Sequence, residues 1–167
     1  VFQQPNPFPM SIYENVVYGL RINGVKDKKV LDEAVETALQ RASIWDEVKD
    51  RLHDSAIGLS GGQQQRVGII RSLIGHPKVL LMDEPFSSLD PLSRKQLQGL
   101  IKKIHQEFNL TVVFVTHDMV EASYLGTRLC IMDKGQIIQI DTAEKIRRHP
   151  KNEFVKRLFE MGGDIDE

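Results

Sequence analysis

The sequence contains no long apolar segment. Its longest uninterrupted apolar runs have four residues, at 79–82, 112–115 and 129–132, whereas a helix that crosses a bilayer needs about 20. There is also no signal-peptide pattern at its start. We therefore expect that these residues do not themselves cross a membrane.

Cysteine and net charge are equally scarce. Cys130 is the only cysteine among the 167 residues, which excludes an internal disulfide and a cysteine-rich metal site and fits a reducing compartment. The 22 basic and 23 acidic residues give a net charge of −1. Without a long basic block, the sequence gives no electrostatic reason to expect nucleic acid as a partner.

The order of helix and strand patterns predicts an α/β protein in three segments. Residues 1–11 contain three prolines, which favour an exposed connector because proline lacks an amide donor and restricts its neighbours. Residues 12–75 are predicted to form a helical lobe, with helices at 29–42 and 45–52 and a third that begins after Ser60. Residues 76–167 are predicted to form an α/β segment.

The α/β segment begins with a strand, helix, strand pattern. Apolar strands at 79–82 and 111–116 flank a helix from Pro91 to about 107, with Asp90 as its N-cap. A crossover of this length predicts parallel strands with their carboxyl ends at one edge. Because both strands are apolar throughout, we expect cover on both faces of the sheet. The buried stripe of the helix is predicted to be Leu92, Leu97, Leu100, Ile101 and Ile104.

The remaining segment predicts shorter elements. A helix is expected from Asp118 to about Gly126, with Glu121 in the position of a capping box. Residues 128–132 and 136–140 are predicted to form a hairpin around 133–135. Amphipathic helices are expected to continue to about Glu160.

A glycine pair after Ser60 is the first candidate site. Ser60, Gly61 and Gly62 at a helix start leave backbone N–H groups unpaired, and the helix dipole adds a partial positive charge there. A phosphate is the natural ligand of such a turn. A glycine-rich turn without a ligand is the alternative interpretation.

Three further candidates follow the two strands. Asp83 and Glu84 end the first strand, where open α/β sheets bind ligands. Because neighbouring side chains on a strand point to opposite faces, one carboxylate can hold Mg²⁺ while the other polarises water. His117 follows the second strand and is expected to face the same crevice as Glu84. The alternatives are a solvated acidic strand end and a histidine without a ligand.

Six motifs together resemble the ATP-binding subunits of ABC transporters. They occur in the family's order over residues 1 to about 150: the Q-loop glutamine Gln3, the signature Leu59–Gln63, the Walker B strand Val79–Asp83, the catalytic glutamate Glu84, the D-loop Ser87–Asp90 and the switch histidine His117. The resemblance implies part of a P-loop NTPase-like ABC ATPase domain, comprising a helical lobe and the second part of a mainly parallel core sheet.

The resemblance also implies roles for these residues. Asp83 and Gln3 serve Mg²⁺ and the attacking water, Glu84 acts as general base, and His117 contacts the γ-phosphate. Ser60 and Gly62 contact the ATP held by an opposite subunit in a head-to-tail dimer. By the same resemblance, Gly61, Gln63 and Asp90 complete the ATP-binding set.

One family motif is absent from the sequence. No G-x-x-x-x-G-K-[ST] P-loop occurs, nor any Gly-Lys dipeptide. Because Val1-Phe2 has the pattern of a strand's end, we expect a preceding segment that carries the P-loop. Without its amides and lysine, residues 1–167 are expected to lack the principal grip on nucleotide and to be inactive alone.

The favoured function is an ATPase subunit of an importer, peripheral on the cytoplasmic face of the membrane. Its expected partners are a second ATPase subunit, transmembrane permease subunits and, indirectly, a solute-binding protein. A DNA-repair ATPase of the same superfamily is disfavoured, because only 57 positions separate Gln3 from Ser60. A non-catalytic interaction fragment is the third interpretation, since the P-loop is absent.

Different segments resemble importers of different solutes. Residues 3–12 and 45–52 look like those of phosphate-import ATPases, which makes phosphate the expected solute. Residues 84–90, 116–119 and 138–142 look more like those of betaine or amino-acid importers. Selectivity in such systems resides mainly in other subunits, so both interpretations stay open.

Overall fold

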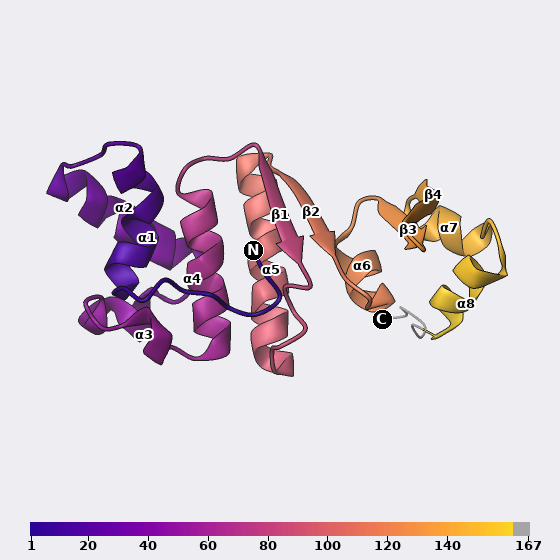
Figure 1. Cartoon of the computed structure of the whole chain (residues 1–167), viewed down its shortest axis with the longest axis horizontal. Coiled ribbons are helices and arrows are strands. Elements are labelled where there is room, and N and C mark those ends of the chain that lie inside the picture. The colour runs from indigo at the N-terminus through magenta and orange to yellow at the C-terminus, as the bar shows by residue number, and fades with distance from the viewer. Residues whose placement is uncertain (162–167) are drawn as a thin grey trace. The chain divides into compact units, whose positions relative to one another are not determined.

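The computed structural model describes residues 1–161, which form two compact units (Figure 1). The first comprises Val1–Val115, and the second begins at Thr116. The segments 1–11, 12–75 and 76–167 were defined by sequence motifs, whereas the two units are defined by contacts. The three segments therefore stay a prediction.

The first unit begins with a helical lobe. Its elements are α1 (Ile12–Ile22), α2 (Lys28–Arg41), α3 (Trp45–Val48), the 3₁₀ helices η1 (Lys49–Arg51) and η2 (Ala56–Gly58), and α4 (Gly61–Leu73). The helices predicted at 29–42 and after Ser60 are confirmed. Helix α1 was not separately anticipated, although Ser11 marks its start by accepting a 3.1 Å hydrogen bond from the Glu14 amide.

The connector before α1 is irregular, as predicted, but its middle is fastened to the lobe. Asn15 is fully buried, and its Oδ1 accepts hydrogen bonds from the Phe8 amide at 2.8 Å and from Arg71 Nη1 at 3.0 Å. The Arg71 guanidinium lies 3.8 Å from the centroid of the Phe8 ring. Burial lowers the pKa of Arg71, although arginine stays charged at any ordinary pH. The charge therefore stacks on an aromatic face.

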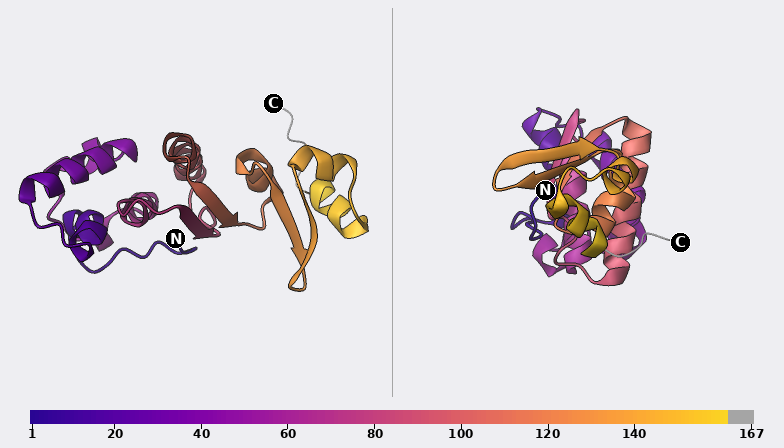
Figure 2. Two further views of the ribbon diagram at one scale, coloured as in Figure 1. Left: turned by 90° about the horizontal axis from the view of Figure 1, so that it is seen from above. Right: turned by 90° about the vertical axis from the view of Figure 1, so that its right-hand side faces the viewer.

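The predicted strand, helix, strand unit is confirmed. Strands β1 (Val79–Asp83) and β2 (Thr111–Val115) pair in parallel, with Val79 opposite Thr111 and Asp83 opposite Val115, and α5 (Pro91–Phe108) connects them. In Figure 2, α5 lies on one side of the strand pair. Val1 runs along the other edge of β1, because its amino group donates to Leu81 O at 2.8 Å and its carbonyl accepts from the Asp83 amide at 2.9 Å.

The expectation that both faces of these strands are covered is wrong for the described residues. Leu80 and Met82 are buried, but Leu81 is 63% exposed. The side chains that share the exposed face are Val79, Leu81, Val113 and Val115. Because side chains alternate along a strand, α5 covers one face only, and the described residues supply no helix for the other.

Leu92 also departs from its predicted place. It is 68% exposed, whereas Leu97, Leu100, Ile101 and Ile104 are buried. At 3.6 residues per turn, position 92 is rotated by about 140° from position 97 around the helix axis. Leu92 therefore lies outside the stripe that meets the core.

The second unit is built around a hairpin. Its elements are α6 (Met119–Leu125), β3 (Leu129–Asp133), β4 (Gln136–Asp141), α7 (Ala143–Arg148) and α8 (Glu153–Met161). The antiparallel β3–β4 ribbon, visible in Figure 2, confirms the predicted hairpin. Lys134 and Gly135 both have positive φ, as a tight hairpin turn requires. Its small core is formed by Leu129, Ile131, Ile146 and Val155.

The predicted start and end of α6 are confirmed, whereas the capping box expected at Glu121 stays a prediction. Asp118 caps the helix through the amides of Val120 and Glu121, and Gly126 is its C-cap. The Glu121 carboxylate accepts a 2.8 Å hydrogen bond from the Thr116 hydroxyl.

Among residues 1–161, no helix combines the length and apolar character that a membrane span needs.

Candidate functional site

Two predicted residues that lie 81 positions apart in the sequence are in contact. Gln3 Nε2 donates a hydrogen bond to Glu84 Oε2 at 3.2 Å. The connector brings Gln3 there because Val1 pairs with β1, while Glu84 directly follows that strand. This contact joins the proposed water-orienting amide to the proposed base.

The backbone holds Glu84 in a defined turn. Its φ is +42°, a left-handed conformation that is uncommon for a residue with a side chain. The Glu84 amide donates to Val115 O at 2.9 Å, and its carbonyl accepts from the Ser87 hydroxyl at 3.0 Å. The turn directs Glu84 away from the ladder positions of β1, whereas Asp83 remains exposed at the end of the strand. The two carboxylates therefore occupy different environments, and their predicted division of roles stays a prediction.

The segment after Glu84 also contacts the connector. Ser88 Oγ donates to Gln3 O at 3.3 Å, so the backbone of Gln3 is held as well as its side chain. Asp90 accepts from the amides of Leu92 at 3.1 Å and Ser93 at 3.0 Å. Hydrogen bonds from Ser93 hold the pKa of Asp90 below its usual range. Asp90 is thus confirmed as the N-cap of α5, and its predicted contact with ATP stays a prediction.

The capping box at Ser60 reduces the number of backbone amides that are available to a phosphate. The Ser60 amide donates to Gln63 Oε1 at 3.0 Å, and the Gln63 amide donates to Ser60 Oγ at 3.3 Å. Two of the amides at this helix start are therefore already paired. Within the described part of the chain, the amides of Gly61 and Gly62 have no such acceptor. An anion at this turn would meet those two N–H groups at the positive end of α4.

The two glycines differ in their surroundings. Nothing lies within 4 Å of a Cβ built on Gly61, whereas a Cβ on Gly62 would come within 2.7 Å of Ser93 Oγ. Gly62 is buried and Gly61 is exposed. Gly62 thus also serves the packing of α4 against α5, a role that the sequence did not reveal.

Replacing Gly62 by alanine is expected to lower the free energy of unfolding of the chain by roughly 1–3 kcal/mol, because the new methyl group overpacks the contact with Ser93. Urea titration followed by circular dichroism measures the change. Gly68→Ala on the same helix is the matched control, since its Cβ meets nothing within 4 Å, and it should not destabilise. Equal stability of both variants would contradict this packing.

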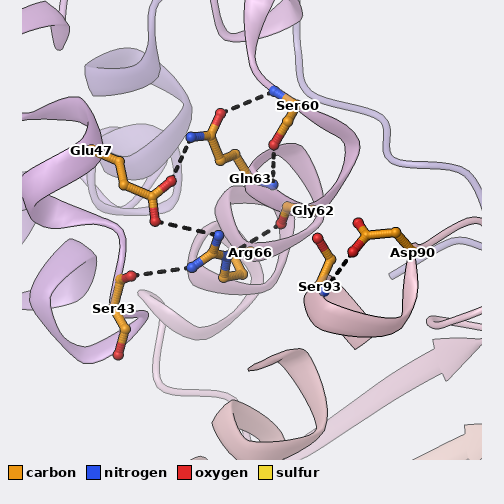
Figure 3. A network of polar contacts seen from close by, with 8 residues as sticks. All are labelled: Ser43, Glu47, Ser60, Gly62, Gln63, Arg66, Asp90 and Ser93. Carbon is orange, nitrogen blue, oxygen red and sulfur yellow. Dashed lines mark hydrogen bonds and ion pairs between the residues drawn. The ribbon is translucent and has the colours of Figure 1, made fainter. Parts of the chain in front are cut away.

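An ion pair between the buried Arg66 and the exposed Glu47 adjoins the turn (Figure 3). Arg66 lies 3.6 Å from Glu47 and donates to Ser43 O at 3.1 Å and Gly62 O at 3.4 Å. Glu47 in turn accepts a 2.5 Å hydrogen bond from Gln63 Nε2. Burial lowers the pKa of Arg66, and the neighbouring Glu47 opposes that shift. The Gln63 side chain therefore already makes hydrogen bonds within the chain, to the Ser60 amide and to Glu47. Its assignment to the ATP-binding set stays a prediction.

Sequence reasoning missed the residues that support the site. Arg66 and Gln65 are buried polar residues of α4, and Glu47 lies on α3. A polar residue in the buried stripe of an amphipathic helix is the only signal that could have marked Gln65 and Arg66. Glu47 carries no comparable signal, because its partners come from distant positions in the sequence.

His117 belongs to the second unit and is exposed. It immediately precedes Asp118, the cap of α6. The expectation that His117 faces the same crevice as Glu84 stays a prediction, since the two residues lie in different units.

The donors near Glu84 fit a magnesium ion that is shared with phosphates. Mg²⁺ prefers oxygen ligands and usually takes only one or two carboxylates from protein, with waters and substrate phosphates completing its shell. Asp83 is exposed, and Gln3 donates to Glu84 through nitrogen, which directs its carbonyl oxygen elsewhere. Within residues 1–161, no group of three or more His, Cys, Asp or Glu residues could hold a metal by itself.

The cleft described in the first unit lies apart from the predicted site residues. A cleft of about 310 Å³ lies among α2, α4 and α5, and its lining includes Val30, Ile70 and Leu100. None of the predicted site residues contributes to it.

Comparisons with known proteins identify the family to which the chain is similar. A family described as "ABC transporter" matches residues 1–87. The "Phosphate import ATP-binding protein PstB 1" of Streptococcus pneumoniae (strain ATCC BAA-255 / R6) is 55% identical over 152 residues, 91% of this chain and 60% of that protein. The protein of the same name from Enterococcus faecalis (strain ATCC 700802 / V583) is 50% identical over 151 residues, 90% of this chain and 59% of that protein.

A third relative has a similar identity and a similar coverage. The "Phosphate import ATP-binding protein PstB 1" of Streptococcus agalactiae serotype III (strain NEM316) is 53% identical over 152 residues, 91% of this chain and 60% of that protein. The chain thus spans about 60% of the length of these curated relatives. The family match covers more than half of the chain and includes the connector, the signature turn and Glu84. The chain therefore belongs to the ABC transporter family, among its ATP-binding subunits.

Proposed function

We propose that these residues form part of the ATP-hydrolysing subunit of an importer, which couples ATP binding and hydrolysis to solute uptake. The contact between Gln3 and Glu84 carries the proposal, because it joins a water-orienting amide to a carboxylate. The names of the relatives, which describe phosphate import, support phosphate as the solute. They also favour import over DNA repair.

The chain's own groups divide the chemistry between them. The Glu84 carboxylate accepts a proton from the attacking water, while the Gln3 amide holds that carboxylate and orients the water. Asp83 and the carbonyl oxygen of Gln3 would hold Mg²⁺, which offsets phosphate charge when bound. His117 would contact the γ-phosphate from the second unit.

The signature turn is proposed to act on nucleotide held by another copy. The amides of Gly61 and Gly62 point from the start of α4 and suit a γ-phosphate. Ser60 keeps its hydroxyl proton for donation, since Oγ accepts from Gln63. Two copies arranged head to tail would then enclose two ATP molecules. The partners proposed beyond this dimer are permease subunits and a solute-binding protein, at the cytoplasmic face of the membrane.

Residues 1–167 alone are expected to hydrolyse Mg-ATP no faster than background, because their sequence contains no P-loop to hold the phosphates. A coupled-enzyme assay on the purified chain measures this rate. The matched control is the same chain with Glu84→Gln, which should give an identical trace. Turnover that disappears with Glu84→Gln would show that the chain grips nucleotide through other residues.

A further inference from the structure

Gln65 makes two hydrogen bonds that no sequence motif anticipates. Its side chain is only 2% exposed. Nε2 donates to Phe2 O at 3.2 Å and to Pro85 O at 3.2 Å. An amide nitrogen carries two hydrogens, so both are used on these carbonyl oxygens.

The two carbonyls belong to the two segments that carry the proposed catalytic pair. Phe2 directly precedes Gln3, and Pro85 directly follows Glu84. One side chain of α4 therefore holds both sides of the 3.2 Å contact between Gln3 and Glu84. The strained turn at Glu84, with φ of +42°, is fixed on one side by Val115 O and on the other by Gln65.

The same helix begins at the signature turn. Gln65 lies five positions after Ser60 and one after Gln64, within the first two turns of α4. Contact with an anion would favour a displacement of this helix start. The Gln65 side chain would pass that displacement to both the connector and the Glu84 turn, because it is bonded to both. Buried hydrogen bonds transmit such a displacement because leaving their donors or acceptors unpaired is costly.

From this geometry we propose that Gln65 is a positioning residue that couples the signature turn to the Gln3–Glu84 pair. The inference rests on the proposed function for the roles of that pair. Gln65 acts through the backbone carbonyls of Phe2 and Pro85, on which both of its Nε2 hydrogens are used. Gln65 sets the distance between the Gln3 amide and the Glu84 carboxylate. It lies on α4, the helix whose start is proposed to bind the γ-phosphate of the ATP held by the other copy.

The first experiment needs no hydrolysis. Gln65→Met keeps an unbranched side chain of similar length and removes both donors. In residues 1–167, we expect amide hydrogen exchange, followed by NMR, to become roughly tenfold faster at Asp83 and Glu84, whose amides donate to Val1 O and Val115 O. Gln64→Met is the matched control, because Gln64 also donates to two carbonyls, those of Ile57 and Leu59. It should leave the exchange of both amides unchanged.

The second experiment measures turnover in a subunit that carries these residues together with a P-loop. Gln65→Met is expected to lower kcat by at least tenfold while KM for ATP changes less than twofold, because the nucleotide grip lies elsewhere. Gln65→Asn keeps the NH₂ group but is one methylene shorter, so it should give a milder loss of kcat. If Gln65→Met fails to fold, Gln65→Asn carries the test. Gln40→Met, at an exposed position on α2, should match wild type.

The outcomes separate this inference from the proposed function. Unchanged exchange at Asp83 and Glu84 in the folded Gln65 variants overturns the coupling. Faster exchange with wild-type kcat overturns its role in positioning the catalytic pair. Full turnover by Glu84→Gln in the same subunit overturns the proposed function instead, whatever the exchange data give.

Discussion

In a subunit that carries these residues together with a P-loop, Glu84→Gln is expected to lower kcat by roughly 10²–10⁴-fold, the scale for a positioned proton acceptor. The amide preserves the shape of the side chain, and its oxygen can still accept the hydrogen bond that Gln3 donates at 3.2 Å. It cannot accept the proton of water. Steady-state hydrolysis gives kcat, and equilibrium binding of a fluorescent ATP analogue gives the affinity, which should stay near wild type.

A neutralised glutamate elsewhere controls for the loss of charge. Glu107→Gln on α5 removes a carboxylate that makes only an exposed 4.0 Å ion pair with Lys103, and surface pairs of this kind contribute little. It should hydrolyse ATP at the wild-type rate. Wild-type turnover by Glu84→Gln, with binding unchanged, would contradict the role assigned to Glu84.

Gly61→Asp is expected to abolish hydrolysis without weakening the binding of Mg-ATP by the altered subunit. Two like charges about 4 Å apart repel by ~4 kcal/mol at an effective dielectric near 20, so the carboxylate would oppose the other copy's γ-phosphate. The chain itself accommodates the change, because a Cβ at Gly61 meets nothing within 4 Å. A carboxylate at a helix start also favours the helix. Hydrolysis rate and equilibrium affinity for ATP are the measurements.

Charge and size are separated by two neutral variants at the same position. Gly61→Asn has the size of the aspartate without its charge, and Gly61→Ala adds only a methyl group. Both should hydrolyse ATP faster than Gly61→Asp. Gly62 is unsuitable for this test, because any Cβ there strains the contact with Ser93. Equal loss in all three Gly61 variants would indicate a steric effect rather than an anion site.

Features set by neighbouring residues could be predicted from the sequence. The caps at Ser60, Asp90 and Asp118 each bind amides two or three positions ahead, so a short stretch of sequence contains the whole interaction. The parallel pairing of β1 with β2 followed from the length of the crossover. The proximity of Gln3 to Glu84 followed only from the resemblance, because 81 positions separate them.

Features set by packing between distant segments could not be predicted. The exposure of Leu81 depends on which elements cover the sheet, and the strand's own composition predicted cover on both faces. The burial of Gly62 depends on Ser93, and the bonds of Gln65 depend on Phe2 and Pro85. A polar residue inside a helix pattern does not reveal which carbonyl oxygens it meets.

The central claim is that the signature turn of one copy completes the hydrolytic site of another. Size-exclusion chromatography in Mg-ATP tests it most directly, using P-loop-containing subunits with Glu84→Gln alone or together with Gly61→Asp. Because Glu84→Gln slows hydrolysis, the closed dimer should accumulate in the single variant. The account predicts an ATP-dependent dimer for Glu84→Gln and a monomer with bound ATP for the double variant. Equal ATP-dependent dimerisation of both would contradict it and would make Ser60–Gln63 only the start of a helix.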